Sequence, residues 1–172
     1  RARLFFVSMV VAVSASASPS PMKVKPGSIA KAARTGFFAG GEATHELSLI
    51  DATTSKAADG SESLAFFYGN DRGQPLRGLP GFFQIVLDRD GKRVAIDLAQ
   101  VSRTAVDPAA LRKKLKSSKL VSALDMTMDP TDSSTNITLS FKEPIELAVE
   151  ASGEKSPSRI AITLKPLGGS KK

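Results

Sequence analysis

The sequence predicts an all-β protein, a β-sandwich of two similar small sheets with one short connecting helix. Its leading signal is an alternating phrase that occurs twice, as RVAIDL at residues 93–98 and as RIAITL at residues 159–164. Every second residue of each copy is aliphatic, which is the period of a strand with one buried face. We therefore expect two similar halves, each of which ends in the same kind of strand.

A second similarity between the two halves lies upstream of the repeated phrase. Residues 48–53 resemble residues 122–127 at a shift of 74 positions, whereas the closing phrases are shifted by 66. The first half therefore carries about eight additional residues, which we assign to the segment 70–81 because its Gly and Pro residues predict a loop. Such a loop on a rigid sheet is either a binding feature or a natural variation in length.

Strand patterning extends over most of the remaining chain. Eight strands are expected, at residues 46–54, 64–68, 82–87, 92–98, 120–128, 135–141, 145–149 and 159–164. Between the halves, Asp107 and Pro108 are typical of an N-cap and a first helical residue. The helix would dock through Leu111 and Leu115, leaving its basic residues in solvent. Mostly short connections and a single helix favour a β-sandwich.

The ends of the chain differ in composition from this core. Residues 1–17 are typical of a signal peptide cleaved near Ala17, with Arg1 and Arg3 before a mainly apolar run at residues 4–13 and an Ala-Ser-Ala ending. This run is too short to span a bilayer, and an amphipathic or buried helix is the alternative interpretation. We predict a linker at 18–41, the sandwich domain at 42–167 and a flexible basic tail at 168–172. The mature protein would be exported, periplasmic and without a membrane span.

Catalytic and metal-binding residue types are scarce. The chain has no Cys and one His, and it contains no nucleophile elbow, phosphate-binding loop or metalloprotease motif. We therefore predict a protein that is not an enzyme, with no catalytic residues, no metal and no cofactor. A hydrolase with an unrecognised site is the less favoured possibility.

The charge balance favours an anionic partner. The formal net charge is +7, from 24 basic and 17 acidic residues, and two of the basic residues lie in the predicted leader. Nucleic acid, an acidic cell-wall polymer and a lipid surface all fit this balance. The export signal and the absence of Trp or of an interleaved aromatic and basic face disfavour nucleic acid.

The repeated phrase also resembles a known family. A strand ending in Arg-aliphatic-x-Ile-Asp-Leu, a short helix and a second strand set closing on a similar phrase resemble the AMIN domain of periplasmic cell-wall amidases and type IV pilus secretins. The matching stretches are residues 92–99, 120–128, 135–141 and 159–166, and the likeness covers about residues 45–166. The resemblance implies a β-sandwich that binds peptidoglycan and targets a protein within the envelope. The second copy has Thr163 at the position of Asp97, so it does not imply two equal sites.

The predicted function is therefore that of an exported peptidoglycan-binding module of the bacterial envelope. The alternative is an adaptor that contacts another envelope protein, such as a secretin or a component of the divisome or pilus, for example by strand addition. The candidate ligand-binding residues are Arg72, Arg77, Arg93, Asp97, Lys113, Lys114, Lys116 and Arg159. Solvated helix and strand ends are the alternative explanation for these charges.

Overall fold

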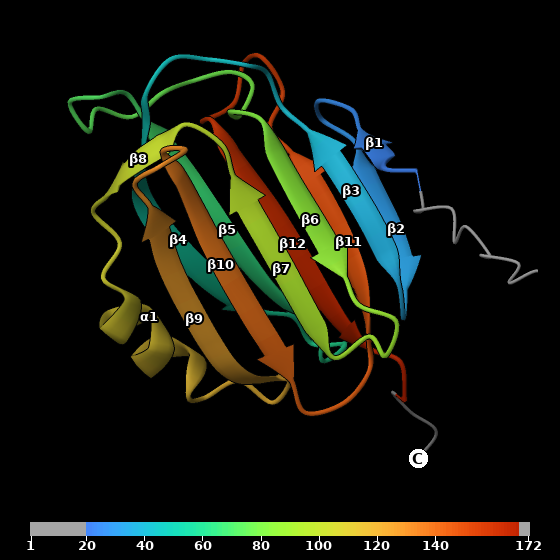
Figure 1. The fold of residues 1–172 in the computed structure, drawn as a ribbon. Coiled ribbons are helices and arrows are strands. Elements are labelled where there is room, and N and C mark those ends of the chain that lie inside the picture. Colours follow the sequence, from blue (N-terminus) through green and yellow to red (C-terminus); the bar gives the residue numbers. More distant parts are fainter. Residues whose placement is uncertain (1–19, 169–172) are drawn as a thin grey trace, which may run out of the picture.

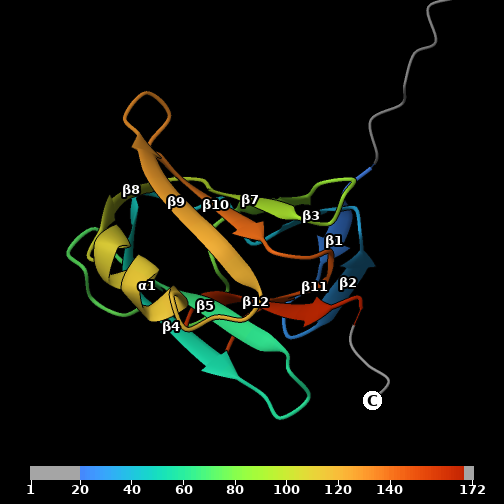
Figure 2. The ribbon, with the colours of Figure 1, turned by 90° about the horizontal axis from the view of Figure 1, so that it is seen from below.

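A computed structural model describes residues 20–168 as two six-stranded sheets that face each other, with one helix beside them (Figures 1 and 2). Sheet A has the strand order β1-β3-β6-β7-β10-β9, and sheet B has the order β2-β11-β12-β5-β4-β8. The elements are β1 (Met22–Val24), β2 (Ile29–Ala33), β3 (Gly36–Gly40), β4 (Leu47–Lys56), β5 (Glu62–Gly69), β6 (Phe83–Leu87), β7 (Arg93–Leu98), β8 (Val101–Thr104), α1 (Pro108–Leu115), β9 (Val121–Asp129), β10 (Ser134–Phe141), β11 (Ile145–Ala151) and β12 (Arg159–Pro166). This arrangement confirms the predicted all-β, two-sheet fold. The predicted leader lies outside the described residues, as do residues 169–172 of the predicted tail.

The two halves of the chain are interleaved, so that neither forms a sheet of its own. In sheet A, the hairpin of β6 and β7 from the first half joins β10 and β9 of the second half. In sheet B, β11 and β12 from the second half join β5 and β4 of the first half. The two closing strands, β7 and β12, therefore occupy equivalent central positions in different sheets. Each sheet depends on both halves for its order.

The core lies between the sheets and is built from the alternate residues that the strand period selects. Ile96 on β7 and Ile162 on β12 occupy the same position of the repeated phrase. Both are at most 1% exposed, and each lies on the inner face of its sheet. The largest buried side chains include Phe38, Phe66, Phe83, Ile85, Leu98 and Ile137. Burial of this apolar surface is the main force that holds the sheets together.

The segment for which the sequence predicts a linker contains three strands. β1 pairs in parallel with β3 in sheet A, and β2 pairs with β11 in sheet B. The chain changes sheets between β2 and β3 at Arg34, whose φ is +67°, and Gly36 has room for no side chain because an added Cβ would lie 2.6 Å from the Cβ of Ala32. These strands are short, and alternate residues of β2 face solvent. They form because the edges of existing sheets supply hydrogen-bond partners, which local periodicity does not reveal.

β8 was also absent from the sequence prediction. Of its four residues Val101 alone is buried, so it carries no readable alternation. It pairs in parallel with the start of β4 and extends sheet B by one strand. Its position is decided by backbone pairing rather than by its own side chains.

The helix follows the sequence prediction closely. The Oδ1 atom of Asp107 accepts a hydrogen bond of 2.9 Å from the N–H group of Ala109, and Pro108 opens the helix. Leu111 and Leu115 are buried, and α1 lies at one side of the sandwich, beside β9 and β4 (Figure 2). The helix therefore covers one open side of the core.

Candidate functional site

The outer faces of the two sheets carry equivalent rows of side chains. Asp97 on β7 and Thr163 on β12 occupy the same place in the repeated phrase, and their neighbours along each strand are buried, so both face outward. Row A, on sheet A, consists of Gln84, Asp97, Asn136 and Thr127 on successive strands. Row B, on sheet B, consists of Ala148, Thr163, Ser63 and Ser55. The two rows can therefore be compared position by position.

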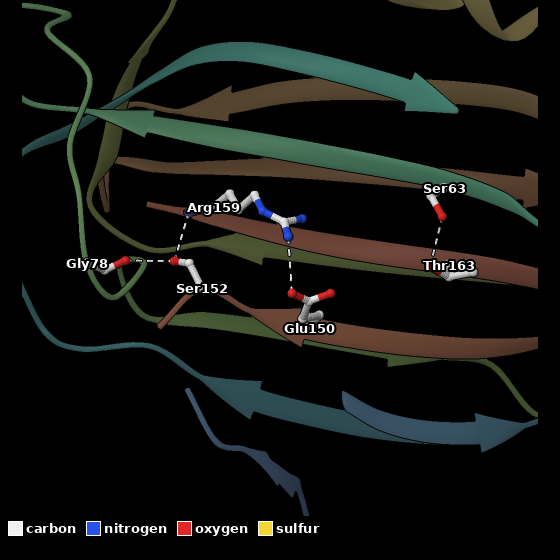
Figure 3. A network of polar contacts seen from close by, with 6 residues as sticks. All are labelled: Ser63, Gly78, Glu150, Ser152, Arg159 and Thr163. Carbon is white, nitrogen blue, oxygen red and sulfur yellow. Dashed lines mark hydrogen bonds and ion pairs between the residues drawn. The ribbon is translucent and has the colours of Figure 1, made fainter. Parts of the chain in front are cut away.

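Two members of row B satisfy each other's polar atoms. The hydroxyl groups of Ser63 and Thr163 lie 2.9 Å apart and share a hydrogen bond across the β5–β12 pair (Figure 3). No charged side chain stands in this row. A ligand that bound here would have to compete with an existing contact.

Arg159, which opens the same strand, is also satisfied within sheet B. One of its terminal guanidinium nitrogens lies 3.1 Å from the Oε1 atom of Glu150 on β11, and both side chains are partly buried. Its backbone N–H group donates to the Oγ atom of Ser152, whose hydroxyl donates in turn to the carbonyl of Gly78 (Figure 3). Arg159 is a predicted ligand-binding residue, and in the structure its guanidinium forms an internal ion pair.

Row A leaves its charged residue without a partner. Asp97 accepts no hydrogen bond from the described residues, and its Oδ1 atom is buried. The amide of the adjacent Asn136 donates to the Oγ atom of Ser134, at 3.3 Å, rather than to Asp97. Burial, with a smaller contribution from the negative charge of Asp132, raises the pKa of Asp97 above its ordinary value. The carboxylate is therefore held in a place that disfavours its charge.

Arg93 on sheet A is likewise free of an ion pair among the described residues. The residue of β6 that corresponds to Glu150 is Val86, because Val86 lies opposite Ala95 as Glu150 lies opposite Ala161. Val86 is 44% exposed and offers no charge. The outer face of sheet A thus presents an exposed guanidinium, an unpaired carboxylate and an exposed apolar side chain. At the same positions of sheet B, Arg159 is paired with Glu150, and Thr163 is hydrogen-bonded to Ser63.

The predicted residues of the long loop do not join this face. The side chain of Asn70 organises the tip of the loop by accepting hydrogen bonds from the N–H groups of Arg72 and Gln74. Arg72 lines a hollow of about 340 Å³ together with Arg103. Arg77 donates to the carbonyl of Lys155, at 3.3 Å, in the turn before β12. The loop therefore places these two predicted cations in different surroundings, Arg72 beside Arg103 and Arg77 beside the turn before β12.

The predicted lysines of the helix point to different surroundings. Lys113 is exposed to solvent, and Lys114 lines a hollow beside β4. Lys116 lines a groove of about 420 Å³ between α1 and the start of β9. This basic groove is lined by Arg112, Leu115, Lys116, Val121, Ser122, Ala123, Leu124 and Lys142. It contains three cationic residues and no carboxylate.

Sequence reasoning did not select Arg112 or Lys142 as site residues. Arg112 stood in the basic helix run, where its spacing did not separate it from its neighbours. Lys142 follows β10, and only the pairing of β10 with β9 brings it beside the helix. No local pattern could have identified it.

Within residues 20–168, no group of three or more acidic or His side chains is arranged to hold a metal ion, and no helix is long and apolar enough to cross a membrane. Comparisons with protein-family models, with curated proteins and with solved structures give no match. The site must therefore be interpreted from its own chemistry.

Proposed function

We propose that this protein is a non-enzymatic peptidoglycan-binding module of the bacterial cell envelope, and that it binds through the outer face of sheet A. The observation that carries the proposal is the difference between the two sheets. Arg93 and Asp97 have no side-chain partner within residues 20–168, although Arg159 is paired with Glu150 and Thr163 with Ser63 at the equivalent positions. If these positions served only to stabilise the fold, we would expect the polar contacts of sheet B to be present in sheet A as well.

The chemistry of this face fits a glycan with acidic stem peptides. A guanidinium such as that of Arg93 binds carboxylates through two parallel hydrogen bonds. The carboxylate of Asp97 accepts from hydroxyl, amide or ammonium donors, and the amides of Gln84 and Asn136 both donate and accept. Each exposed contact is weak. A polymer with repeated units compensates through many simultaneous contacts.

The resemblance of the repeated phrase to the AMIN domain is a second, independent support. Arg93 and Asp97 belong to the phrase that carries this resemblance. The predicted signal peptide, if it is cleaved, would deliver the protein to the compartment that contains peptidoglycan. Targeting another protein or complex to the wall, without turnover of the polymer, is the role that follows.

A co-sedimentation assay with washed sacculi tests this proposal. We expect the purified protein to sediment with sacculi and Arg93→Ala to weaken the apparent affinity about tenfold, in line with the loss of one charge-assisted contact. Arg159→Ala is the matched control, because it removes the equivalent arginine from sheet B and should change the affinity less than about twofold. Binding by the unaltered protein should fall as the salt concentration rises.

Equal losses in the two arginine variants would show that sheet A has no special role. Sedimentation that is insensitive to salt and to Arg93→Ala would contradict the charge-based account. Release of soluble muropeptides by the pure protein would contradict the non-enzymatic role.

A further inference from the structure

The loop between β5 and β6 has no counterpart of similar length in the second half of the chain. It spans residues 70–82, whereas the equivalent connection between β10 and β11 spans residues 142–144. Such a loop is either a binding feature or a natural variation in length. The structure bears on this choice, because the tip of the loop lies beside β8 and forms a hollow with β4 and β8 (Figure 1).

Hydrogen bonds hold the tip of this loop in place. The Oγ atom of Ser48 on β4 donates to the carbonyl of Asn70, at 2.7 Å. A terminal guanidinium nitrogen of Arg103 on β8 donates to the carbonyl of Asp71, at 3.0 Å. The side-chain oxygen of Asn70 also accepts from two N–H groups within the tip. The loop is therefore tied to both strands, and a ligand would not have to order it.

The hollow beneath this tip, the arginine pocket, has both polar and apolar walls. Its volume of about 340 Å³ is at the lower end of the range for small-molecule sites. The residues that line it include Ser48, Ile50, Asp71, Arg72, Arg103 and Ala105. Ile50 and Ala105 supply apolar surface, and the other four supply polar groups. The pocket therefore suits a short ligand that carries charge at one point and a small apolar group at another.

Three charged residues line the pocket without pairing with one another. The guanidinium of Arg72 makes no hydrogen bond or ion pair with the described residues. Arg103 uses one N–H group on the carbonyl of Asp71, and a guanidinium has five such donors. The carboxylate of Asp71 forms no ion pair within residues 20–168. All three residues are exposed, so a ligand can reach their charges.

The combination of these charges selects the ligand. Two guanidinium groups favour a carboxylate or a phosphate, because each can donate two parallel hydrogen bonds to such an anion. The negative charge of Asp71 disfavours the more highly charged phosphate, and its oxygens accept a hydrogen bond from an N–H group. A carboxylate close to an N–H group and a small side chain is the chemistry of a peptide's carboxyl-terminal end.

We propose that the arginine pocket binds the free carboxyl-terminal end of a peptide. Arg72 and Arg103 hold the terminal carboxylate, and Asp71 accepts from a backbone N–H group of the peptide. Ile50 and Ala105 contact a small terminal side chain. The tail of a partner protein and the stem peptide of a cell wall share this chemistry and differ in the configuration of their last residue. The pocket lies at the β8 edge of sheet B and does not depend on the function proposed for sheet A.

The probe for this site is acetyl-alanyl-alanine with a free carboxylate. Titration into isotopically labelled protein should shift the backbone amide resonances of Gly73 and Arg103, which line the pocket. The same peptide with a terminal amide should bind about tenfold more weakly or worse, because it cannot form the charge-assisted bonds. The L,L and D,D forms of the acid distinguish a protein tail from a wall stem peptide as the source.

Acetate and inorganic phosphate test whether negative charge alone is sufficient. Each should bind about tenfold more weakly than the peptide acid. Acetate lacks the N–H group that Asp71 accepts from, and phosphate is repelled by the charge of Asp71.

A matched pair of arginine variants locates the site. Arg72→Gln should weaken binding of the peptide acid about tenfold, and it removes no contact among the described residues. Arg89→Gln makes the same change in the exposed turn between β6 and β7, and it should change the affinity less than about twofold. Arg103→Lys keeps the charge but loses the planar pair of donors, so it should also weaken binding. Melting temperatures establish that each variant is folded.

Four results would overturn the proposal. The peptide amide could bind as well as the acid, acetate or phosphate could bind as tightly as the peptide, the Arg72→Gln and Arg89→Gln variants could lose equal affinity, or neither form of the peptide could bind. The sedimentation experiment with Arg93→Ala is read separately, since Arg93 lies on sheet A. A failed peptide titration beside intact sedimentation therefore leaves the proposed function standing.

Discussion

Sheet A and sheet B use the same strand plan but treat their outer side chains in different ways. In sheet B, Arg159 is paired with Glu150, and Thr163 with Ser63. In sheet A, the equivalent Arg93 and Asp97 are left without partners among the described residues. The buried positions, by contrast, are filled with similar aliphatic residues in both copies. The comparison indicates that packing constrains the core of each copy, whereas the outer rows are free to take different roles.

The largest expected effect tests whether the two copies are equal in the core. Ile96→Ala and Ile162→Ala each remove a fully buried side chain from an equivalent position. Each should lower the free energy of unfolding by about 2 to 5 kcal/mol, through lost burial and a cavity. Urea unfolding followed by circular dichroism measures both. A loss below about 1 kcal/mol in one variant alone would show that the copies are not packed alike.

The same experiment tests the interleaving of the halves. Because each sheet contains strands from both halves, we expect one cooperative transition in either variant. Two separated transitions, each sensitive to one of the substitutions, would contradict this expectation.

A smaller effect tests the closed pair of row B. Thr163→Val removes the hydrogen bond to Ser63 and should lower the free energy of unfolding by about 1 kcal/mol. Thr138→Val is the matched control, since Thr138 is an outward-facing threonine of β10 in sheet A that makes no side-chain hydrogen bond with the described residues. Denaturant midpoints measured side by side give the difference. Equal losses would mean that the Ser63 contact contributes nothing specific.

The smallest effect concerns the open carboxylate of row A and depends on pH. The pKa of Asp97 is raised in the folded protein, so the folded state holds this proton more tightly than the unfolded state. Stability from this group is therefore greatest below the ordinary aspartate pKa and is lost as the pH rises through the folded-state value. Asp97→Asn should become more stable relative to the unaltered protein as the pH rises from acidic to neutral. A difference that stays constant over that range would refute this account.

Much of the strand pattern could be predicted from the sequence. The alternation in residues 93–98 and 159–164 predicts that Ile96 and Ile162 are buried. Asp107 and Pro108 predict the start of the helix. Each of these signals is contained in a few consecutive residues, so it can be recognised without the tertiary structure. The strands β1, β2, β3 and β8 were missed, because their residues show little alternation and they form by pairing with edges that other segments create.

The candidate site was predicted only in part. Arg93 and Asp97 were selected because they stand at the polar positions of a repeated phrase, and the structure places both on one open face. Arg159 was selected for the same reason, but it is bound to Glu150 on the neighbouring strand. The sequence offered no means to tell these two arginines apart, since the deciding residues, Val86 and Glu150, lie on different strands.

By itself, the sequence determined the period of the strands, the capped helix, the similarity of the halves and the basic balance of charge. These are local or additive properties of the chain. The tertiary structure alone decided which strands share a sheet, which polar side chains meet and which edge stays open. Lys142 and Lys116 illustrate the reason, because they are far apart in the sequence and line one groove only after β10 pairs with β9. Contacts of this kind depend on strand partners from distant parts of the chain, which no local pattern specifies.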